Sequence, residues 1–304
     1  MSHRTLIQAA ELQTLLATGP APVLLDCGFE LADGTAGRRA YEAGHLPGAW
    51  YAHLEADLSG PKSTAATVAD GRVGNSGRHP LPSRTALAAT VARWGVRPGV
   101  QVVCYDDQAS PYAARAWWLL RWLGHHEVAV LDGGRAAWRA LGGEFTTALP
   151  ESVASAASAA SPTSPAPYPA LSAGMPHIDA ATLQQRLGQG RLFDARAGER
   201  FRGEVEPLDP VAGHIPGATL RFFKDNLLPD GRFKPAAQLA AEFDALGASG
   251  LPALALVHQC GSGVTACHNL LAMAHAGFGD TVLYPGSWSE WCSDPARPMV
   301  RRRT

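Results

Sequence analysis

The sequence predicts an α/β protein made of two tandem domains, each with a mainly parallel sheet flanked by helices. Two observations support this fold class. Apolar runs of strand length alternate with helical segments along the chain, and such alternation favours parallel sheets. The same order of elements also occurs twice, which indicates an internal repeat. A chain of 304 residues is long enough for two hydrophobic cores.

The first half contains clear start and stop signals. Ser83 suits the N-cap of one helix and Pro111 the first turn of another. Residues 44–49, G-H-L-P-G-A, form a strong turn signal. A polar, glycine-rich loop is expected from residue 59 to about residue 82. The predicted strands are residues 23–26, 100–105 and 128–131, and the predicted helices are residues 7–17, 38–43, 84–94, 111–122 and 135–138.

Between the halves the composition changes to alanine, serine and proline. Such segments form linkers that their prolines partly extend. We therefore expect a first domain over residues 1–148, a linker over residues 149–175 and a second domain over residues 176–304. The predicted strands of the second domain are residues 192–194, 254–259 and 281–284, and its predicted helices are residues 180–187, 235–246 and 265–276. The turn of the first half recurs here as G-H-I-P-G-A at residues 213–218.

Cys260 ends a strand and precedes a short loop with two glycines, after which a helix begins at Thr265. This strand–loop–helix order aims backbone N–H groups at one point, at the positive end of the helix. A thiolate at that point is stabilised, because the loop favours the anion. Cys260 is therefore a candidate nucleophile. A buried structural cysteine after a core strand is the alternative interpretation.

The repeat helps to choose between these interpretations. An ungapped alignment of the two halves pairs Cys260 with Asp107 and Trp291 with Trp138. The first half thus has a carboxylate at the loop position and cannot perform thiol chemistry there. Duplication followed by loss in one copy explains this pattern better than a core cysteine does. We therefore expect Cys260 to be the nucleophile and the first domain to be catalytically inactive.

Composition excludes several classes of function. The net charge of −1 gives no sign of a nucleic acid or an acidic membrane as partner. No apolar run approaches the ~20 residues that span a bilayer, and the N-terminus lacks an apolar signal core. The five cysteines show no paired C-x-x-C spacing, which argues against a disulfide framework and against a zinc site. We expect a cytoplasmic protein without metal or cofactor.

Together, the Cys260 loop, the two G-H-[LI]-P-G-A turns and the two terminal tryptophan motifs resemble the tandem rhodanese-type sulfurtransferases. Residues 260–266, C-G-S-G-V-T-A, are similar to the loop of the mercaptopyruvate branch; the thiosulfate branch has basic residues after the cysteine. The resemblance implies two rhodanese-like domains. It also implies transfer of a sulfane sulfur from 3-mercaptopyruvate or thiosulfate to cyanide, a thiol or thioredoxin through a Cys260 persulfide.

The resemblance also implies which loop residues bind the sulfur. The backbone from Gly261 through Gly263 and Val264 to Thr265 would surround the anionic sulfur with N–H groups, as an oxyanion hole does. The two glycines are expected to permit the backbone angles that this requires. For Thr265 two interpretations stay open, because its hydroxyl can donate to the sulfur or cap the helix.

Three further residues are implied as a proton relay. Ser262 is similar to the loop serine of the mercaptopyruvate branch, and the acid and histidine of that relay fall on Glu55 and His79. An imidazole suits this role because its pKa lies near neutrality. A solvated histidine and glutamate are the alternative interpretation, since the inserted loop before His79 weakens the alignment.

A ketoacid donor carries a carboxylate, which a guanidinium binds in bidentate fashion. The resemblance places Arg200 in this role, whereas Arg196 and Arg202 are expected to make surface or structural contacts. The family often has a second arginine shortly after a Glu-Pro pair, where this chain has Leu208. Its absence predicts weak discrimination between mercaptopyruvate and thiosulfate.

The sequence argues against two other classes of function. Cysteine phosphatases of similar fold need the pattern C-x5-R, but Ala266 stands at the arginine position. A non-catalytic binding module would not need the intact Cys260 loop. A rhodanese that prefers thiosulfate remains the main alternative.

Overall fold

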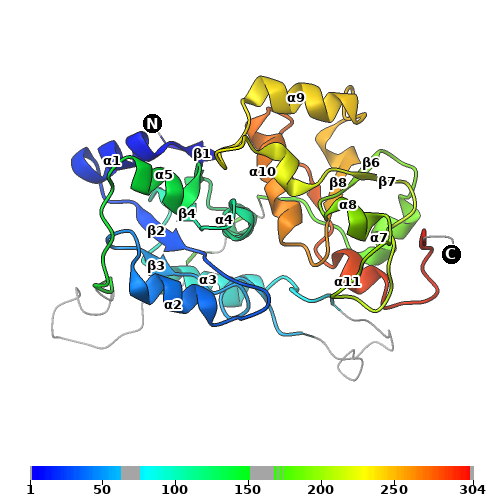
Figure 1. The fold of residues 1–304 in the computed structure, drawn as a ribbon, viewed down its shortest axis with the longest axis horizontal. Helices are drawn as coiled ribbons and strands as arrows, with labels where there is room; N and C mark the ends of the chain where they lie inside the picture. The colour runs from blue at the N-terminus through cyan, green and yellow to red at the C-terminus, as the bar shows by residue number, and fades with distance from the viewer. Residues whose placement is uncertain (1, 63–75, 151–167, 170, 173, 302–304) are drawn as a thin grey trace. The chain divides into compact units, whose positions relative to one another are not determined.

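The computed structural model describes residues 2–62, 76–150, 168–169, 171–172 and 174–301. The chain divides into two compact units, each with its own parallel sheet (Figure 1). Most of the expected linker and the middle of the glycine-rich loop lie outside the described residues. The first unit comprises Met1–Leu58, Pro82–Gly174 and Asp230–Arg232, and the second comprises Ser59–Leu81, Met175–Pro229 and Phe233–Thr304.

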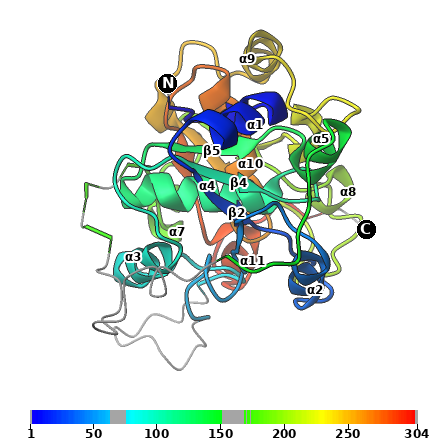
Figure 2. The ribbon, with the colours of Figure 1, turned by 90° about the vertical axis from the view of Figure 1, so that its left-hand side faces the viewer.

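The first unit contains a five-stranded parallel sheet in the order β1-β5-β4-β2-β3. The strands are β1 (Leu6–Ile7), β2 (Val23–Asp26), β3 (Trp50–Tyr51), β4 (Val102–Tyr105) and β5 (Val128–Leu131). The helices are α1 (Ala9–Thr18), α2 (Ala36–Ala43), α3 (Arg84–Arg93), α4 (Pro111–Leu123) and α5 (Gly134–Ala140). Helices α1 and α5 lie on one side of this sheet, and α2 and α3 on the other (Figures 1 and 2).

Local sequence explains these elements. The Ser83 hydroxyl caps α3 by accepting the N–H of Ala86, and Pro111 begins α4. Every residue of β4 and β5 is buried, as expected for strands covered on both faces. Trp117 and Trp118 on α4 are fully buried.

The second unit contains a four-stranded parallel sheet in the order β7-β6-β8-β9. The strands are β6 (Arg191–Asp194), β7 (Ala218–Leu220), β8 (Leu256–Gln259) and β9 (Val282–Leu283). The helices are α7 (Ala180–Gln185), α8 (Gly198–Phe201), α9 (Ala236–Ala245), α10 (Thr265–His275) and α11 (Ser287–Trp291), with 3-10 turns η1 (Phe223–Asn226) and η2 (Ala253–Ala255). The interior strand β8 is fully buried and leads directly toward Cys260.

The repeated turns make the same contacts in both units. His45 Nδ1 donates to the Tyr41 carbonyl oxygen at 2.8 Å, and its ring stacks on the Tyr41 ring. His214 makes the matching 2.8 Å contact with the Phe201 carbonyl and stacks on that ring. Because the two halves share these contacts, we assign both histidines a structural role in the turns.

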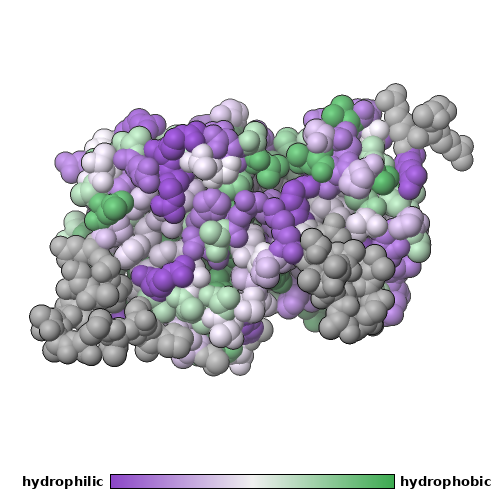
Figure 3. Space-filling view, turned by 90° about the horizontal axis from the view of Figure 1, so that it is seen from below, coloured by the Kyte–Doolittle hydropathy of each residue, from purple (hydrophilic) through white to green (hydrophobic). Residues whose placement is uncertain are grey.

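The surface is mixed in character. Figure 3 shows one face, on which hydrophilic residues are interspersed with scattered hydrophobic ones. No helix among the described residues has the length and apolar character needed to cross a bilayer. The large exposed hydrophobic residues are spread through the sequence: Leu31, Leu141, Leu149, Leu171, Val205, Leu208, Leu254 and Val300.

Candidate active site

Cys260 lies between the end of β8 and the start of α10, where the sequence predicted it. The residue is only 1% exposed. The loop beside it is covered by side chains, because a Cβ added to Gly261 would meet the guanidinium ends of Arg78 and Arg200. Flexible side-chain ends can move to admit a small molecule at lower cost than backbone can.

The loop is held by residues around the start of α11. The Cys260 carbonyl accepts the Trp288 N–H at 3.0 Å, and the Gly261 carbonyl accepts the Ser289 N–H at 2.9 Å. A trans peptide places its N–H opposite its carbonyl. The N–H groups of Gly261 and Ser262 therefore point away from α11.

Two further features complete the loop. The Cys260 N–H donates to the Ser287 hydroxyl at 3.1 Å, and Ser287 is held at φ 54°. Val264 stands at the cap position of α10, and its apolar side chain offers no acceptor to the first amides of that helix. Thr265 is the first helical residue and does not occupy the cap position.

The two loop glycines serve different purposes, contrary to the expectation that both permit special backbone angles. Gly263 has φ +75°, and a Cβ there would lie 2.4 Å from the Pro285 carbonyl oxygen, so a side chain is excluded. Gly261 is not in the left-handed region. Its missing side chain instead leaves room for Arg78 and Arg200.

His79 and Ser262 lie in direct contact within the second unit. His79 Nδ1 is 2.8 Å from Ser262 Oγ, and His79 is 2% exposed. The segment Ser59–Leu81 belongs to the second unit, and the Arg78 N–H anchors it by donating to Ser289 Oγ at 3.0 Å. The structure thus brings Cys260, Ser262 and His79 together in one unit.

Glu55 belongs to the first unit. It is exposed, and its backbone N–H donates to His53 Nδ1 at 3.1 Å. Its place in a proton relay stays a prediction.

The arginines near the loop differ in their surroundings. Arg196 is buried against Asp194 at 2.7 Å, and Arg202 forms an exposed pair with Glu204, so both make the structural or surface contacts that were expected. Arg200 lies on α8, and its guanidinium pairs with the Glu206 carboxylate at 2.7 Å.

Asp209 links Arg200 to a residue that sequence analysis missed. Its two carboxylate oxygens accept from Arg200 Nη2 at 3.1 Å and from Arg78 Nη1 at 2.7 Å. Arg78 directly precedes His79, and that adjacency was the only signal in the sequence that could have revealed it.

A family model described as a rhodanese-like domain matches residues 8–141 and again residues 179–294. The chain belongs to the rhodanese-like family. This membership confirms the fold that the loop, the turns and the tryptophan motifs indicated. The first match also spans the segment Ser59–Leu81, which packs with the second unit.

Relatives cover nearly the whole chain. A probable 3-mercaptopyruvate sulfurtransferase of Pseudomonas aeruginosa is 49% identical over 99% of each chain. A putative thiosulfate sulfurtransferase of Mycobacterium tuberculosis is 41% identical over 98% of this chain and 97% of its own. The crystal structure of SseA from Escherichia coli, from a study of 3-mercaptopyruvate sulfotransferases and their rhodanese fold, superimposes with a TM-score of 0.71 at 27% identity, covering 95% and 100% of the two chains.

The first rhodanese-like unit has a different residue at the loop position from the one expected. Asp26 pairs with Tyr105 in one sheet, and Asp194 pairs with Gln259 in the other. The residue that corresponds to Cys260 is therefore Asp106, and the alignment with Asp107 was wrong by one position. The ungapped alignment matched the two tryptophan motifs. The segment between the loop position and the motif is one residue longer in the first half than in the second, so the match shifted the loop by one residue.

The Asp106 carboxylate binds the backbone amides of the loop that follows it. Its carboxylate oxygens accept four backbone N–H groups, from Gln108, Ser110, Tyr112 and Ala113, at 2.8–3.0 Å. Burial nevertheless raises the pKa of Asp106 to about 6. The first rhodanese-like unit thus binds an anion of its own at this place, in keeping with the expected lack of thiol chemistry.

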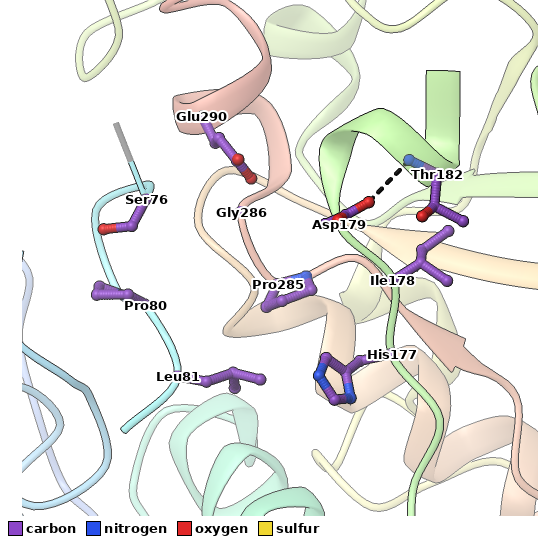
Figure 4. A pocket seen from close by; sticks show the side chains of 10 residues that line it. All are labelled: Ser76, Pro80, Leu81, His177, Ile178, Asp179, Thr182, Pro285, Gly286 and Glu290. Carbon is purple, nitrogen blue, oxygen red and sulfur yellow. Dashed lines mark hydrogen bonds between the residues drawn. The ribbon is translucent and has the colours of Figure 1, made fainter. Parts of the chain in front are cut away.

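A pocket of about 430 Å³ adjoins the loop in the second unit. Figure 4 shows the segment around residues 76–81 on one side, the segment before α7 on the other, and Pro285 between them. Pro285 also lies against Gly263, so this residue connects the wall of the pocket with the Cys260 loop. Its lining consists of Ser76, Pro80, Leu81, His177, Ile178, Asp179, Thr182, Pro285, Gly286 and Glu290.

Proposed function

We propose that this protein is a sulfurtransferase that takes a sulfane sulfur from 3-mercaptopyruvate or thiosulfate onto Cys260 and passes it to a thiophilic acceptor. The observation that carries the proposal is the Cys260 loop. Its carbonyls are tied back to α11, so the amides of Gly261 and Ser262 face the other side, near the uncapped start of α10. Such amides stabilise an anionic sulfur. Relatives named for both donors support the same activity.

The first half-reaction forms one bond and breaks another. The Cys260 thiolate attacks the outer sulfur of the donor, and a sulfur–sulfur bond forms. With thiosulfate, the electron pair of the cleaved bond leaves on sulfite. With mercaptopyruvate, it leaves on the methylene carbon, which takes up the proton that the donor thiol gives up, and pyruvate is released.

Ser262 and His79 suit this proton transfer. Their 2.8 Å contact offers a path between a hydroxyl and an imidazole, and general acid–base catalysis of this kind contributes roughly 10²–10⁴-fold. Glu55 as the third member is part of the same proposal and rests on resemblance. In the second half-reaction an acceptor thiolate or cyanide attacks the outer sulfur and returns the Cys260 thiolate.

A thiosulfate-preferring rhodanese is the second candidate. Leu208 at the place of an expected arginine favours it, and so does the relative named as a putative thiosulfate sulfurtransferase. The residues after Cys260 are not basic, but the guanidinium groups beside Gly261 supply positive charge. The two candidates share the Cys260 persulfide and differ in the donor.

We propose domains over residues 1–148 and 176–304, with the catalytic one completed by Arg78 and His79. A cytoplasmic location is supported by five cysteines that are all unpaired. A thiol protein such as thioredoxin is a suitable acceptor, because its thiolate can attack a persulfide.

Steady-state kinetics with both donors and cyanide as acceptor tests the function. Mass spectrometry of the donor-treated protein should find one added sulfur atom on the Cys260 peptide. Release of that sulfur by cyanide is also expected. Failure of both donors to modify Cys260 would refute the proposal.

A further inference from the structure

Ser289 contacts two segments that come from different halves of the sequence. Its backbone N–H donates to the Gly261 carbonyl at 2.9 Å, and its hydroxyl accepts the Arg78 N–H at 3.0 Å. Arg78 directly precedes His79, and Gly261 directly precedes Ser262. Each partner of the His79–Ser262 contact therefore follows a residue that Ser289 holds.

These contacts close a ring. From Ser289 the ring runs through Arg78 to His79. It then crosses to Ser262 over the 2.8 Å contact between imidazole and hydroxyl, and it returns through Gly261 to the Ser289 N–H. A ring closed by hydrogen bonds of 3.0, 2.8 and 2.9 Å leaves little freedom to its members. The separation between the imidazole and the hydroxyl thus depends on the residue at the far side of the ring.

The Ser289 side chain is oriented for this contact. It is buried, and its hydroxyl donates to the Gly286 carbonyl at 3.2 Å. A hydroxyl has one proton to donate and lone pairs that accept, so the oxygen remains able to accept the Arg78 N–H. Removal of this oxygen would deprive the Arg78 N–H of its acceptor, which is costly for a group shielded from water. We therefore expect the segment that carries His79 to shift when the hydroxyl is lost.

Gly77 allows the segment to approach Ser289 closely. It has φ +82°, and a Cβ there would lie 2.7 Å from the Gly286 carbonyl oxygen and 3.1 Å from Ser289 Oγ. A residue with a side chain would be strained by the backbone angle and would also clash with the neighbouring backbone. The close approach thus occurs directly before the residue whose N–H binds Ser289.

We propose that Ser289 is a positioning residue that holds His79 within reach of Ser262 for proton transfer from a 3-mercapto-2-oxo acid donor. This inference rests on the proposed sulfurtransferase function. Proton transfer needs a heavy-atom separation of about 2.6–3.2 Å, and a displacement of about 1 Å can slow a reaction roughly 10²-fold. Thiosulfate, whose first half-reaction moves no proton, should depend on Ser289 much less.

The test measures single-turnover persulfide formation at saturating donor in wild type, Ser289→Ala and Ser293→Ala. Ser289→Ala removes the hydroxyl and keeps the N–H that binds Gly261. Its rate with mercaptopyruvate should fall roughly 10- to 100-fold, whereas its rate with thiosulfate should change little. Ser293→Ala is the matched control, because the exposed Ser293 also donates its hydroxyl to a carbonyl three residues earlier. Both of its rates should equal those of the wild type.

Two further variants test the path through His79. Added to His79→Gln, Ser289→Ala should cause no further slowing with mercaptopyruvate, because the imidazole that it positions is already gone. Gly77→Ala keeps the Ser289 hydroxyl but displaces the segment, so it should slow the same donor selectively and replaces Ser289→Ala if that variant does not fold. Gly99→Ala is its control, since Gly99 has φ +80° with nothing within 4 Å of its Cβ position.

Nitrogen NMR of the His79 ring provides a readout without turnover. The Nδ1 signal should move in Ser289→Ala and stay in place in Ser293→Ala. Unchanged rates in Ser289→Ala, equal slowing with both donors, or a further independent loss in the His79→Gln background would overturn the inference. A wild-type protein that forms no persulfide with either donor would refute the proposed function itself, and the NMR comparison would still report whether Ser289 positions His79.

Discussion

His79 Nδ1 lies 2.8 Å from Ser262 Oγ, and the two residues come from different halves of the sequence. The contact forms because the segment Ser59–Leu81 packs with the second unit, where Ser289 binds the Arg78 N–H. Residues that precede the first unit's α3 in the sequence thus complete the surroundings of Cys260.

Cys260→Ser should abolish sulfur transfer from both donors, because a hydroxyl forms no persulfide. Turnover with cyanide and the mass of the donor-treated protein measure this. Cys292→Ser is the control, since burial raises the pKa of the Cys292 thiol to about 11 and makes it a poor nucleophile. Comparable residual activity in the two variants would exclude Cys260 as the nucleophile.

His79→Gln should slow persulfide formation from mercaptopyruvate by roughly 10²-fold or more. Thiosulfate should be affected much less, because its first half-reaction moves no proton. Single-turnover mixing with each donor gives both rates. If His79 and Ser262 act as one path, His79→Gln combined with Ser262→Ala should be no slower than the worse single variant; fully additive losses would contradict a shared path.

Gly263→Ala should destabilise the protein and impair sulfur transfer. A Cβ at φ +75° is strained, and it would also lie 2.4 Å from the Pro285 oxygen. Gly217→Ala isolates the backbone effect, because Gly217 has φ +77° with nothing near its Cβ position. We expect about 1–2 kcal/mol for the control and a larger loss for Gly263→Ala, both measured by urea unfolding. Equal losses of unfolding free energy in the two variants would show that the protein adjusts to avoid the clash with Pro285.

Asp106 should make stability depend on pH. Because burial raises its pKa from 3.8 to about 6, the folded protein binds this proton more tightly than the unfolded chain does. The contribution of Asp106 to the free energy of unfolding is therefore most favourable below pH 3.8 and declines as the pH rises through about 6, by about 3 kcal/mol at most. Asp106→Asn should lack this decline.

Urea unfolding at several pH values between 4 and 7 measures that difference. Asp107→Asn is the matched control, because the Asp107 side chain is 42% exposed. Its pH profile should follow the wild type. Parallel profiles for wild type and Asp106→Asn would argue against the raised pKa.

The elements set by local patterns could be predicted from the sequence. Ser83 caps its helix and Pro111 begins the next, because capping and proline geometry act within a few residues. Cys260 likewise lies between a buried strand and a helix, as its neighbours indicated. Periodicity and turn signals suffice for features of this range.

Other features depend on tertiary contacts and could not be predicted, although the resemblance did bring His79 and Ser262 into one relay. Asp209 links Arg200 to Arg78, which lies 131 residues before Asp209 in the sequence, and nothing local indicates that one acid will meet both arginines. The correspondence of Cys260 with Asp106 follows from strand pairing, which an ungapped alignment cannot detect. Gly261 leaves space for two guanidinium groups, and this role can be recognised only once the positions of Arg78 and Arg200 are known.

The packing of Ser59–Leu81 with the second unit means that the two copies of the repeat are not independent modules. A gene cut at the alanine- and proline-rich stretch would leave the later copy with its cysteine but without the imidazole and the guanidinium that the earlier copy lends it. The first half therefore remains indispensable to the chemistry of the second, although it carries Asp106 where the second carries Cys260.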